Sequence, residues 1–197
     1  MVDGCHNLAE FMEAIKKDNN QAREIFEDNC IKNKFGLSCF KAGLYNTLGR
    51  GCKRNKERAH EMFRRGCEED CYKSCTNAGL MLTSRDKLVQ LREDYQEGAK
   101  YLEKGCQLGD SISCYHLSLL HMGTFAPLGN NMKKAFEYTK KACEKDHMPA
   151  CVNLHLMYKR GEGTPKDEVL AEKYKQKIKA FNDTLNDNVQ IDFQKGI

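Results

Sequence analysis

Residues 59–75 read AHEMFRRGCEEDCYKSC, and the chain repeats this pattern three more times. In each copy a small residue precedes a cysteine by eight positions, and a bulky apolar residue follows the small one by three. A second cysteine comes eight or nine residues after the first. The copies begin at Ala22, Ala59, Gly98 and Ala135, in steps of 37, 39 and 37 residues. A period in the thirties made of helical patterns is typical of a helical solenoid.

Helical spacing of apolar residues predicts two helices in each repeat. We expect a single solenoid over residues 1–185 and a C-terminal tail over residues 186–197. Five αα repeats are predicted, at about 2–33, 36–70, 72–109, 111–146 and 148–182. One hairpin cannot bury its apolar stripe alone, so the hairpins must stack. The predicted fold class is therefore all-α, a right-handed αα-hairpin solenoid of the tetratricopeptide type.

Each hairpin opens with the second cysteine of the preceding junction, and the first hairpin opens with Cys5. The interior residues recur at fixed distances from this opening cysteine. We expect position +4 to let two helices approach and position +6 to fill the groove between hairpins. The +4 residues are Ala9, Gly43, Gly79, Ser118 and His155, and the +6 residues are Phe11, Tyr45, Met81, Leu120 and Met157. The first helix, predicted over residues 5–17, should turn a stripe of Leu8, Phe11, Met12 and Ile15 inward.

Charge and composition exclude several classes of function. The net charge is +4, from 32 basic and 28 acidic residues that are mixed throughout. This balance gives no electrostatic reason to expect nucleic acid or a membrane surface as a partner. No 18-residue apolar window exists, so we expect no membrane span. The first 20 residues hold four acidic residues and no arginine, which argues against a secretory signal and a mitochondrial presequence.

Eight of the eleven cysteines are in register with the repeat. The first of each pair ends one hairpin and the second opens the next, so a tight turn brings their Cα atoms within disulfide range. The predicted disulfides are Cys30–Cys39, Cys67–Cys75, Cys106–Cys114 and Cys143–Cys151. A loop of about nine residues closed in this way stabilises the fold by roughly 2.6 kcal/mol. Ordered disulfides indicate an oxidising compartment, although the N-terminus shows no route to the secretory pathway.

The other three cysteines are predicted to be free thiols. Cys52 and Cys71 lie at opposite ends of one hairpin, about 16 Å apart along a helix, which is too far for a disulfide. Cys5 opens the first hairpin, so its partner would have to lie upstream; either it is free or an N-terminal segment is missing. Zinc is disfavoured because no C-x-x-C motif occurs.

The chain resembles the Sel-one-like repeat (SLR) family of αα-hairpin solenoids over about residues 4–182. The resemblance rests on the A-x2-bulky spacing, the G-x-G turns at Gly49/Gly51 and Gly161/Gly163, and the 36–39-residue period. SLR repeats joined by C-x7-C junctions are typical of two groups that the chain resembles: the Helicobacter cysteine-rich proteins and, more closely, the metazoan cytochrome c oxidase assembly factors of the mitochondrial intermembrane space. DGCHNLAEFMEAIKKD, EDNCIKNKFGLSCFKAGLY and MYKRGEGTPKDEVLAEKYKQKIKAF carry the second match.

This resemblance implies a non-enzymatic factor for the assembly of respiratory complex IV in the intermembrane space. It implies protein partners, namely complex IV assembly intermediates and the disulfide-relay import machinery that traps such proteins by oxidative folding. We expect a monomer. Relatives carry an extra N-terminal segment with a partner for the first cysteine, and this sequence departs from them there.

Two alternatives are kept. One is haem or copper handling in the same compartment, with His116 and His121 as candidate ligands and Met122 and Met157 close by; otherwise we expect no cofactor. The other is a secreted cysteine-rich SLR protein with β-lactam-binding activity. Residues 38–41 and 84–87 match the S-x-x-K motif of that chemistry, but its S-D-N and K-T-G motifs are absent, so we predict no catalytic residues.

Overall fold

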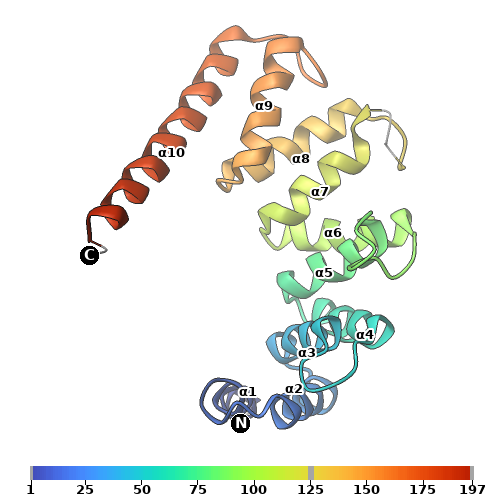
Figure 1. The fold of residues 1–197 in the computed structure, drawn as a ribbon. Coiled ribbons are helices and arrows are strands. Elements are labelled where there is room, and N and C mark those ends of the chain that lie inside the picture. Colours follow the sequence, from blue (N-terminus) through green and yellow to red (C-terminus); the bar gives the residue numbers. More distant parts are fainter. Residues whose placement is uncertain (1, 124–126, 196–197) are drawn as a thin grey trace. The chain divides into compact units, whose positions relative to one another are not determined.

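The structure, a computed structural model, describes residues 2–123 and 127–195. Over these residues it is all-helical, with consecutive helices folded back on one another as hairpins (Figure 1). The elements are α1 (Val2–Phe11), the π-helical turn η1 (Met12–Lys16), α2 (Asn19–Asn33), α3 (Gly36–Leu48), α4 (Lys56–Glu68), α5 (Tyr72–Thr83), α6 (Tyr95–Gln107), α7 (Ser111–His121), α8 (Met132–Glu144), α9 (Met148–Arg160) and α10 (Glu168–Lys195). The prediction of an all-α hairpin fold is confirmed.

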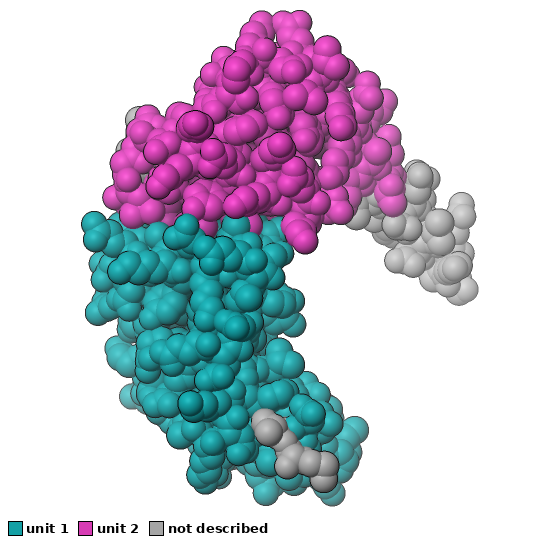
Figure 2. Space-filling view, turned by 180° about the vertical axis from the view of Figure 1, so that it is seen from behind, with its two compact units in different colours: residues 1–113 teal, residues 114–197 magenta. Residues whose placement is uncertain are grey.

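The chain forms two compact units, residues 1–113 and residues 114–197, coloured separately in Figure 2. In the first unit, α1 packs on α2, α3 on α4 and α5 on α6, and the contacts of α2 with α3 and of α4 with α5 join these hairpins into a stack. In the second unit, α9 packs against both α8 and α10. The helices named here therefore pack against helices that adjoin them in the chain, as a repeat protein requires.

Local chemistry sets where the second helix of each hairpin begins. An Asp or Asn at the N-cap accepts a hydrogen bond from the backbone N–H three residues on, which satisfies one of the otherwise unpaired donors of the first turn. These caps are Asp18, Asn55, Asp94, Asn131 and Asp167.

The G-x-G turns set where two of the first helices end. Gly49 and Gly161 stop α3 and α9 with φ of 72° and 74°, in the left-handed region that glycine adopts without strain. The second glycine of each turn lies against the start of an earlier helix. A Cβ on Gly51 would come within 2.7 Å of Asn20 N, and one on Gly163 within 2.6 Å of Met132 C. Both turns therefore need glycine for close packing as well as for φ.

The interior positions follow the predicted rule in most hairpins. Tyr45, Met81 and Met157 at position +6 are only 1–2 % exposed. At position +4, a Cβ on Gly43 would come within 2.6 Å of the Phe63 ring, and one on Gly79 within 2.6 Å of Leu102 Cγ. Glycine at +4 therefore lets the two helices of a hairpin approach closely.

The predicted inward stripe of the first helix is wrong for three of its four residues. Leu8, Phe11 and Ile15 are 46 %, 44 % and 66 % exposed, whereas Ala9 and Met12 pack into the core. Ala9 and Met12 lie three positions apart and meet α2, and Leu8 and Phe11 lie on another side of α1. The π-helical turn from Met12 also breaks the 3.6-residue period that the prediction assumed for Ile15.

The last helix is longer than expected. We predicted that it ends at Leu185 and that residues 186–197 form a tail, whereas α10 continues to Lys195. The stretch between Pro165 and Gly196 contains neither proline nor glycine, the two residues that most often end a helix.

Candidate functional sites

The turn between the two cysteines of each junction is built on one left-handed residue. These residues are Lys34, Asp70, Gly109 and Asp146, with φ of 55°, 56°, 91° and 59°. At the second junction, Cys71 N–H donates to the Gly66 carbonyl at 3.0 Å and Asp70 N–H donates to the Cys67 carbonyl at 3.2 Å. This is the Schellman pattern, which satisfies the last carbonyls of a helix while reversing the chain.

The first junction is one residue longer, and its backbone shows why. There, Phe35 N–H donates to the Asn29 carbonyl at 3.4 Å, which spans one more residue than the corresponding bond at the second junction. The third and fourth junctions keep the shorter span, with Asp110 N–H bonded to the Gly105 carbonyl and His147 N–H bonded to the Ala142 carbonyl. The nine-residue spacing of Cys30 and Cys39, against eight elsewhere, therefore follows from a wider turn.

The structure places the cysteine pairs of three junctions in disulfides. The Sγ–Sγ distances are 2.15 Å for Cys30–Cys39, 2.05 Å for Cys67–Cys75 and 2.10 Å for Cys143–Cys151, with Cα–Cα distances of 4.6, 4.5 and 4.7 Å. Cys106 and Cys114 each take part in a disulfide. Among the described residues, Cys5, Cys52 and Cys71 have free thiols, and Cys71 is buried. These three disulfides thus staple one hairpin to the next within each unit.

The residue before the first cysteine of a junction faces the residue before the second. A Cβ on Gly66 would lie 2.8 Å from Ser74 Cβ and 2.9 Å from Cys39 Cβ. A Cβ on Gly105 would lie 3.0 Å from Ser113 Cβ. Because Gly66 and Gly105 have no side chain, the helix that ends at the junction touches the helix that begins there. The two cysteines of the junction therefore lie where these helices are in contact.

The serine of the first S-x-x-K match is buried in the fold. Ser38 is fully buried, its Oγ lies 2.9 Å from His6 Nδ1, and it accepts a hydrogen bond from Asn29 Nδ2 at 2.8 Å. Burial lowers the pKa of His6, against the opposing effect of Glu10. Lys41 lies 3.0 Å from Glu13 Oε2. Ser38 therefore bridges α1, α2 and α3, and no substrate can reach it without opening these helices.

The second S-x-x-K match lies in the loop between α5 and α6. Ser84 Oγ accepts a hydrogen bond from Asp86 N–H at 3.0 Å, a contact that shapes the turn after α5. The carbonyls of Lys87 and Gln90 accept hydrogen bonds from Lys56 Nζ at 2.5 and 2.9 Å, which hold the loop against α4. Both motif residues thus lie in a structural loop.

Two half-buried carboxylates, Glu27 and Glu13, organise the charged groups of the first unit. Glu27 pairs with Arg58 at 3.0 Å and Arg23 at 3.2 Å, and accepts from Asn46 Nδ2 at 2.8 Å. Burial raises the pKa of Glu27, but the hydrogen bonds from Asn46 and Arg58 outweigh it and leave the pKa lowered. These charges are satisfied by one another, so they stabilise the contacts among α2, α3 and α4.

Glu13 plays the same part nearer the N-terminus. It pairs with Lys41 at 3.0 Å and with Arg50 at 3.2 Å. Burial raises the pKa of Tyr45, and the neighbouring Glu13 carboxylate raises it further. Sequence reasoning did not find either carboxylate network, because its members come from helices far apart in the chain and share no motif.

The two histidines proposed as haem or copper ligands lie in different surroundings. His121 is buried and stacks on Tyr138 with the ring centres 6.1 Å apart, and the His116 ring lies 5.9 Å from that of Tyr115. Five residues of an α-helix turn the chain through about 140° beyond one full turn, so the two imidazoles leave α7 on different sides. A ligand role for His116 and His121 stays a prediction.

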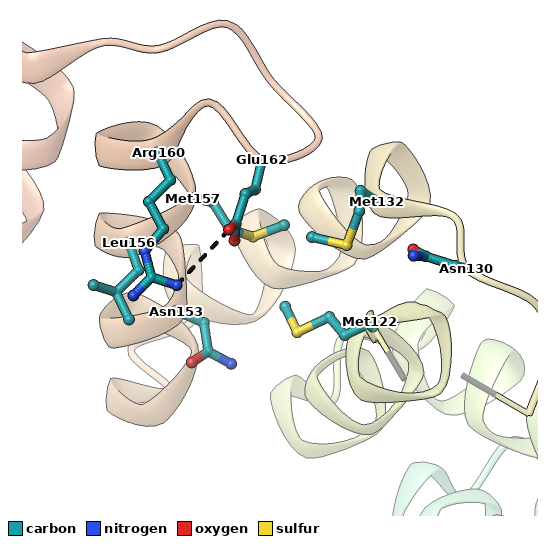
Figure 3. Close-up of a pocket in the computed structure, with 9 residues that line it drawn as sticks. Met122, Asn130, Met132, Asn153, Leu156, Met157, Arg160 and Glu162 are labelled. Carbon is teal, nitrogen blue, oxygen red and sulfur yellow. Dashed lines mark ion pairs between the residues drawn. The ribbon is translucent and has the colours of Figure 1, made fainter. Parts of the chain in front are cut away.

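A cleft of about 450 Å³ lies in the second unit between the end of α7, the start of α8 and α9 (Figure 3). Met122, Met132 and Met157 line it together with Leu156. Its polar residues are Asn130 and Asn153 and the ion pair of Arg160 with Glu162 at 3.7 Å. Sequence reasoning noted Met122 and Met157 but missed Met132, which follows a loop.

Among the described residues, no three His, Cys, Asp or Glu side chains gather in an arrangement that could hold a metal ion. Within the same part of the chain, no helix combines the length and apolar character needed to cross a bilayer.

Stacked helical hairpins with a period in the thirties and glycine-mediated crossings define an αα-hairpin repeat protein. The family description "Sel1 repeat" matches residues 2–27, 36–71, 74–110, 111–147 and 149–177, and the chain belongs to this family. A solved Sel1 repeat protein from Oxalobacter formigenes has the same fold, with a TM-score of 0.76 at 18 % identity over 91 % of this chain and 73 % of that one.

Curated relatives are more similar in sequence. The chain is 31 % identical over 236 residues to a Drosophila melanogaster protein named "Cytochrome c oxidase assembly factor 7 homolog", with 99 % of this chain and 86 % of that protein covered. It is 35 % identical over 181 residues to "Cytochrome c oxidase assembly factor 7" from Danio rerio, with 90 % and 79 % covered. The match thus extends over nearly the whole chain.

Proposed function

We propose that this protein is an assembly factor for cytochrome c oxidase and acts by binding partner proteins. The observation that carries the proposal is the 31–35 % identity, over 90–99 % of the chain, to proteins named for that role. The partners would be assembly intermediates of complex IV, and the chain would act as a monomer.

The packing of the motif residues favours binding over catalysis. Ser38, which the S-x-x-K match singled out, is fully buried and hydrogen-bonded to His6 and Asn29. The half-buried carboxylates Glu13 and Glu27 are each paired with two basic side chains. Solenoids of helical hairpins commonly bind partners over an extended surface, without a dedicated pocket.

The junction disulfides favour the mitochondrial intermembrane space as the compartment. Structural disulfides persist where the surroundings are oxidising and are rare in the cytosol. Eight cysteines in register would be substrates for the disulfide-relay import machinery, which would then trap the folded chain. Mitochondrial association also agrees with the names of the relatives.

Loss of the protein tests the proposed function. In cells that lack it, we expect less fully assembled complex IV on native gels and lower cytochrome c oxidase activity, with the other respiratory complexes retained. Returning the wild-type chain should restore both. Unchanged complex IV in cells without the protein would refute the assembly role.

A thiol count tests the compartment separately. The protein, isolated from mitochondria, is denatured and alkylated without reductant, and its mass is measured. We expect three alkylated cysteines, Cys5, Cys52 and Cys71, and a Cys52→Ser variant should show two. Alkylation of all eleven cysteines would show a reducing compartment and overturn the assignment to the intermembrane space.

A further inference from the structure

The cleft of the second unit is lined by three methionines from three different segments. Met122 follows α7, Met132 is the first residue of α8, and Met157 lies in α9. Figure 3 shows the three thioether side chains directed toward the same space. Met157 is 2 % exposed, and the other two are partly buried. The three sulfurs therefore share one cleft that solvent reaches.

The repeat pattern accounts for Met157 but not for the other two. Met157 occupies position +6, where every hairpin has a large apolar residue. Met122 is at position +8, where the other hairpins have Glu13, Thr47, Thr83 and Lys159. Met132 lies eleven residues before the first cysteine of its junction, where other repeats have Asn19, Lys56 and Tyr95. Met122 and Met132 thus stand where other repeats have mostly polar residues, and both line the same cleft as Met157. Filling the core does not require methionine at these two positions.

The backbone around the cleft is fixed by local contacts. Asn131 N–H donates to the His121 carbonyl at 3.1 Å, which ties the start of α8 to the end of α7. Gly163, in the turn after α9, packs directly on the backbone of Met132. The Cα atoms of the three methionines are therefore held in place, while three rotatable bonds in each side chain leave the sulfurs free to adjust.

The donor set selects the kind of ion. Thioether sulfur is neutral and soft, and soft sulfur ligands favour Cu(I), whereas Mg²⁺ and Ca²⁺ need oxygen ligands and Zn²⁺ takes thiolate, imidazole or carboxylate. Among the described residues that line the cleft, Glu162 is the one carboxylate, and it is paired with Arg160. A monovalent ion with neutral ligands adds one charge to a cleft whose own charges cancel.

We propose that Met122, Met132 and Met157 form a binding site for one Cu(I) ion, held by the three thioether sulfurs. Binding transfers no electron, since the ion enters and leaves as Cu(I). It releases no proton, because a thioether has none to lose, so the affinity is independent of pH where a thiolate site would weaken in acid. This site is a further function, independent of the proposed assembly role.

The experiment uses the full chain with its disulfides intact and Ag(I) as a redox-inert probe of Cu(I). Cys5→Ser, Cys52→Ser and Cys71→Ala remove the competing thiols, and circular dichroism verifies the fold. Methionine labelled with ¹³C at the ε-methyl gives one NMR signal for each of the eight methionines. We expect the signals of Met122, Met132 and Met157 to shift together and to stop shifting at one equivalent of Ag(I). If the variant that lacks Cys5, Cys52 and Cys71 is unfolded, the wild-type chain is titrated instead, because the NMR spectrum still reports each methionine separately.

Cu(I) affinity, measured by competition with bicinchoninate, gives the second arm. Met132→Leu keeps the volume but removes the sulfur, and we expect it to weaken Cu(I) binding at least tenfold. Met81→Leu, in the core of the first unit, is the matched control and should leave the affinity unchanged. The proposal is overturned if Ag(I) leaves the three signals in place or moves only one of them. It is also overturned if Met132→Leu, made in the chain without the three free thiols, binds Cu(I) as tightly as that parent chain does.

Discussion

Replacing Gly66 with alanine tests the helix crossing at the second junction. The new Cβ would lie 2.8 Å from Ser74 Cβ and 2.9 Å from Cys39 Cβ, closer than such atoms approach in real proteins. Neither neighbour can withdraw easily, because Cys39 is bonded to Cys30 and Ser74 precedes the bonded Cys75. Alanine gains about 1 kcal/mol over glycine inside a helix, whereas overpacking a core costs about 1–3 kcal/mol. We expect Gly66→Ala to lower the free energy of unfolding by about 1–2 kcal/mol.

A second substitution isolates the cause. Ser74 Oγ, the nearest atom to the new Cβ, is buried and has no hydrogen-bond partner among the described residues. Ser74→Ala alone should therefore change stability by less than about 0.5 kcal/mol, because no hydrogen bond is lost. When Ser74→Ala is combined with Gly66→Ala, it should restore part of the free energy of unfolding that Gly66→Ala loses. Such non-additivity is expected for residues in contact and not for distant ones. The fourth junction already carries this pair, as Ala142 and Ala150.

The assay is guanidinium denaturation followed by circular dichroism, with intact disulfides verified by mass. Gly105→Ala, whose Cβ would meet Ser113 in the third junction, should behave like Gly66→Ala. If the Gly66→Ala variant is as stable as the wild type, the junction accommodates the added methyl group and the reasoning is wrong. Strict additivity of the two substitutions would show that Ser74 is not the neighbour that matters.

Three further results are expected. Cys67→Ser with Cys75→Ser should lower the free energy of unfolding by roughly 2.6 kcal/mol in the same assay, from the lost constraint on the unfolded chain, and no change would contradict the staple. Burial lowers the pKa of His6, so its contribution to stability is present above about pH 6.5 and is lost as the pH falls through the folded-state pKa. His6→Gln should therefore reduce the fall of the melting temperature between pH 7 and pH 5. A fall as steep as that of the wild type would contradict this. Glu27 has a lowered pKa, so its contribution to stability is fully present above about pH 4.3 and is lost progressively as the pH falls from there through the lower folded-state pKa. Glu27→Gln should cost about 1.5–3 kcal/mol at pH 7, because Arg58 loses a charged partner, and much less at pH 3, as denaturation at both pH values would show.

The features that could be predicted from sequence are those that neighbours in the chain determine. Asn55 and Asn131 cap helices through a residue three positions away, and Gly49 ends one through its own φ. The hairpin bounds therefore follow from local patterns. Glycine at position +4 was also predictable, since Gly43 and Gly79 recur at the same point of the repeat.

Features that depend on distant contacts were not predictable. The pairing of Glu27 with Arg58 spans 31 residues and leaves no periodic signal. The exposure of Leu8 depends on which side of α1 meets α2, which an apolar stripe alone does not specify. Met132 escaped notice because its relation to Met122 and Met157 exists only after the hairpins have folded.

The left-handed turns at the junctions influence which cysteines pair when the chain is oxidised. Eight cysteines can pair in 105 ways, and three more thiols add wrong partners. Each turn, however, is closed by backbone bonds such as Cys71 N–H to the Gly66 carbonyl, which require no sulfur chemistry. The backbone thus brings Cys67 and Cys75 together before an oxidant acts, even though Cys71 lies between them in the chain. At the other three junctions each predicted partner is the nearest cysteine along the chain. Correct pairing becomes a set of independent local events, and no long search through mispaired intermediates is needed.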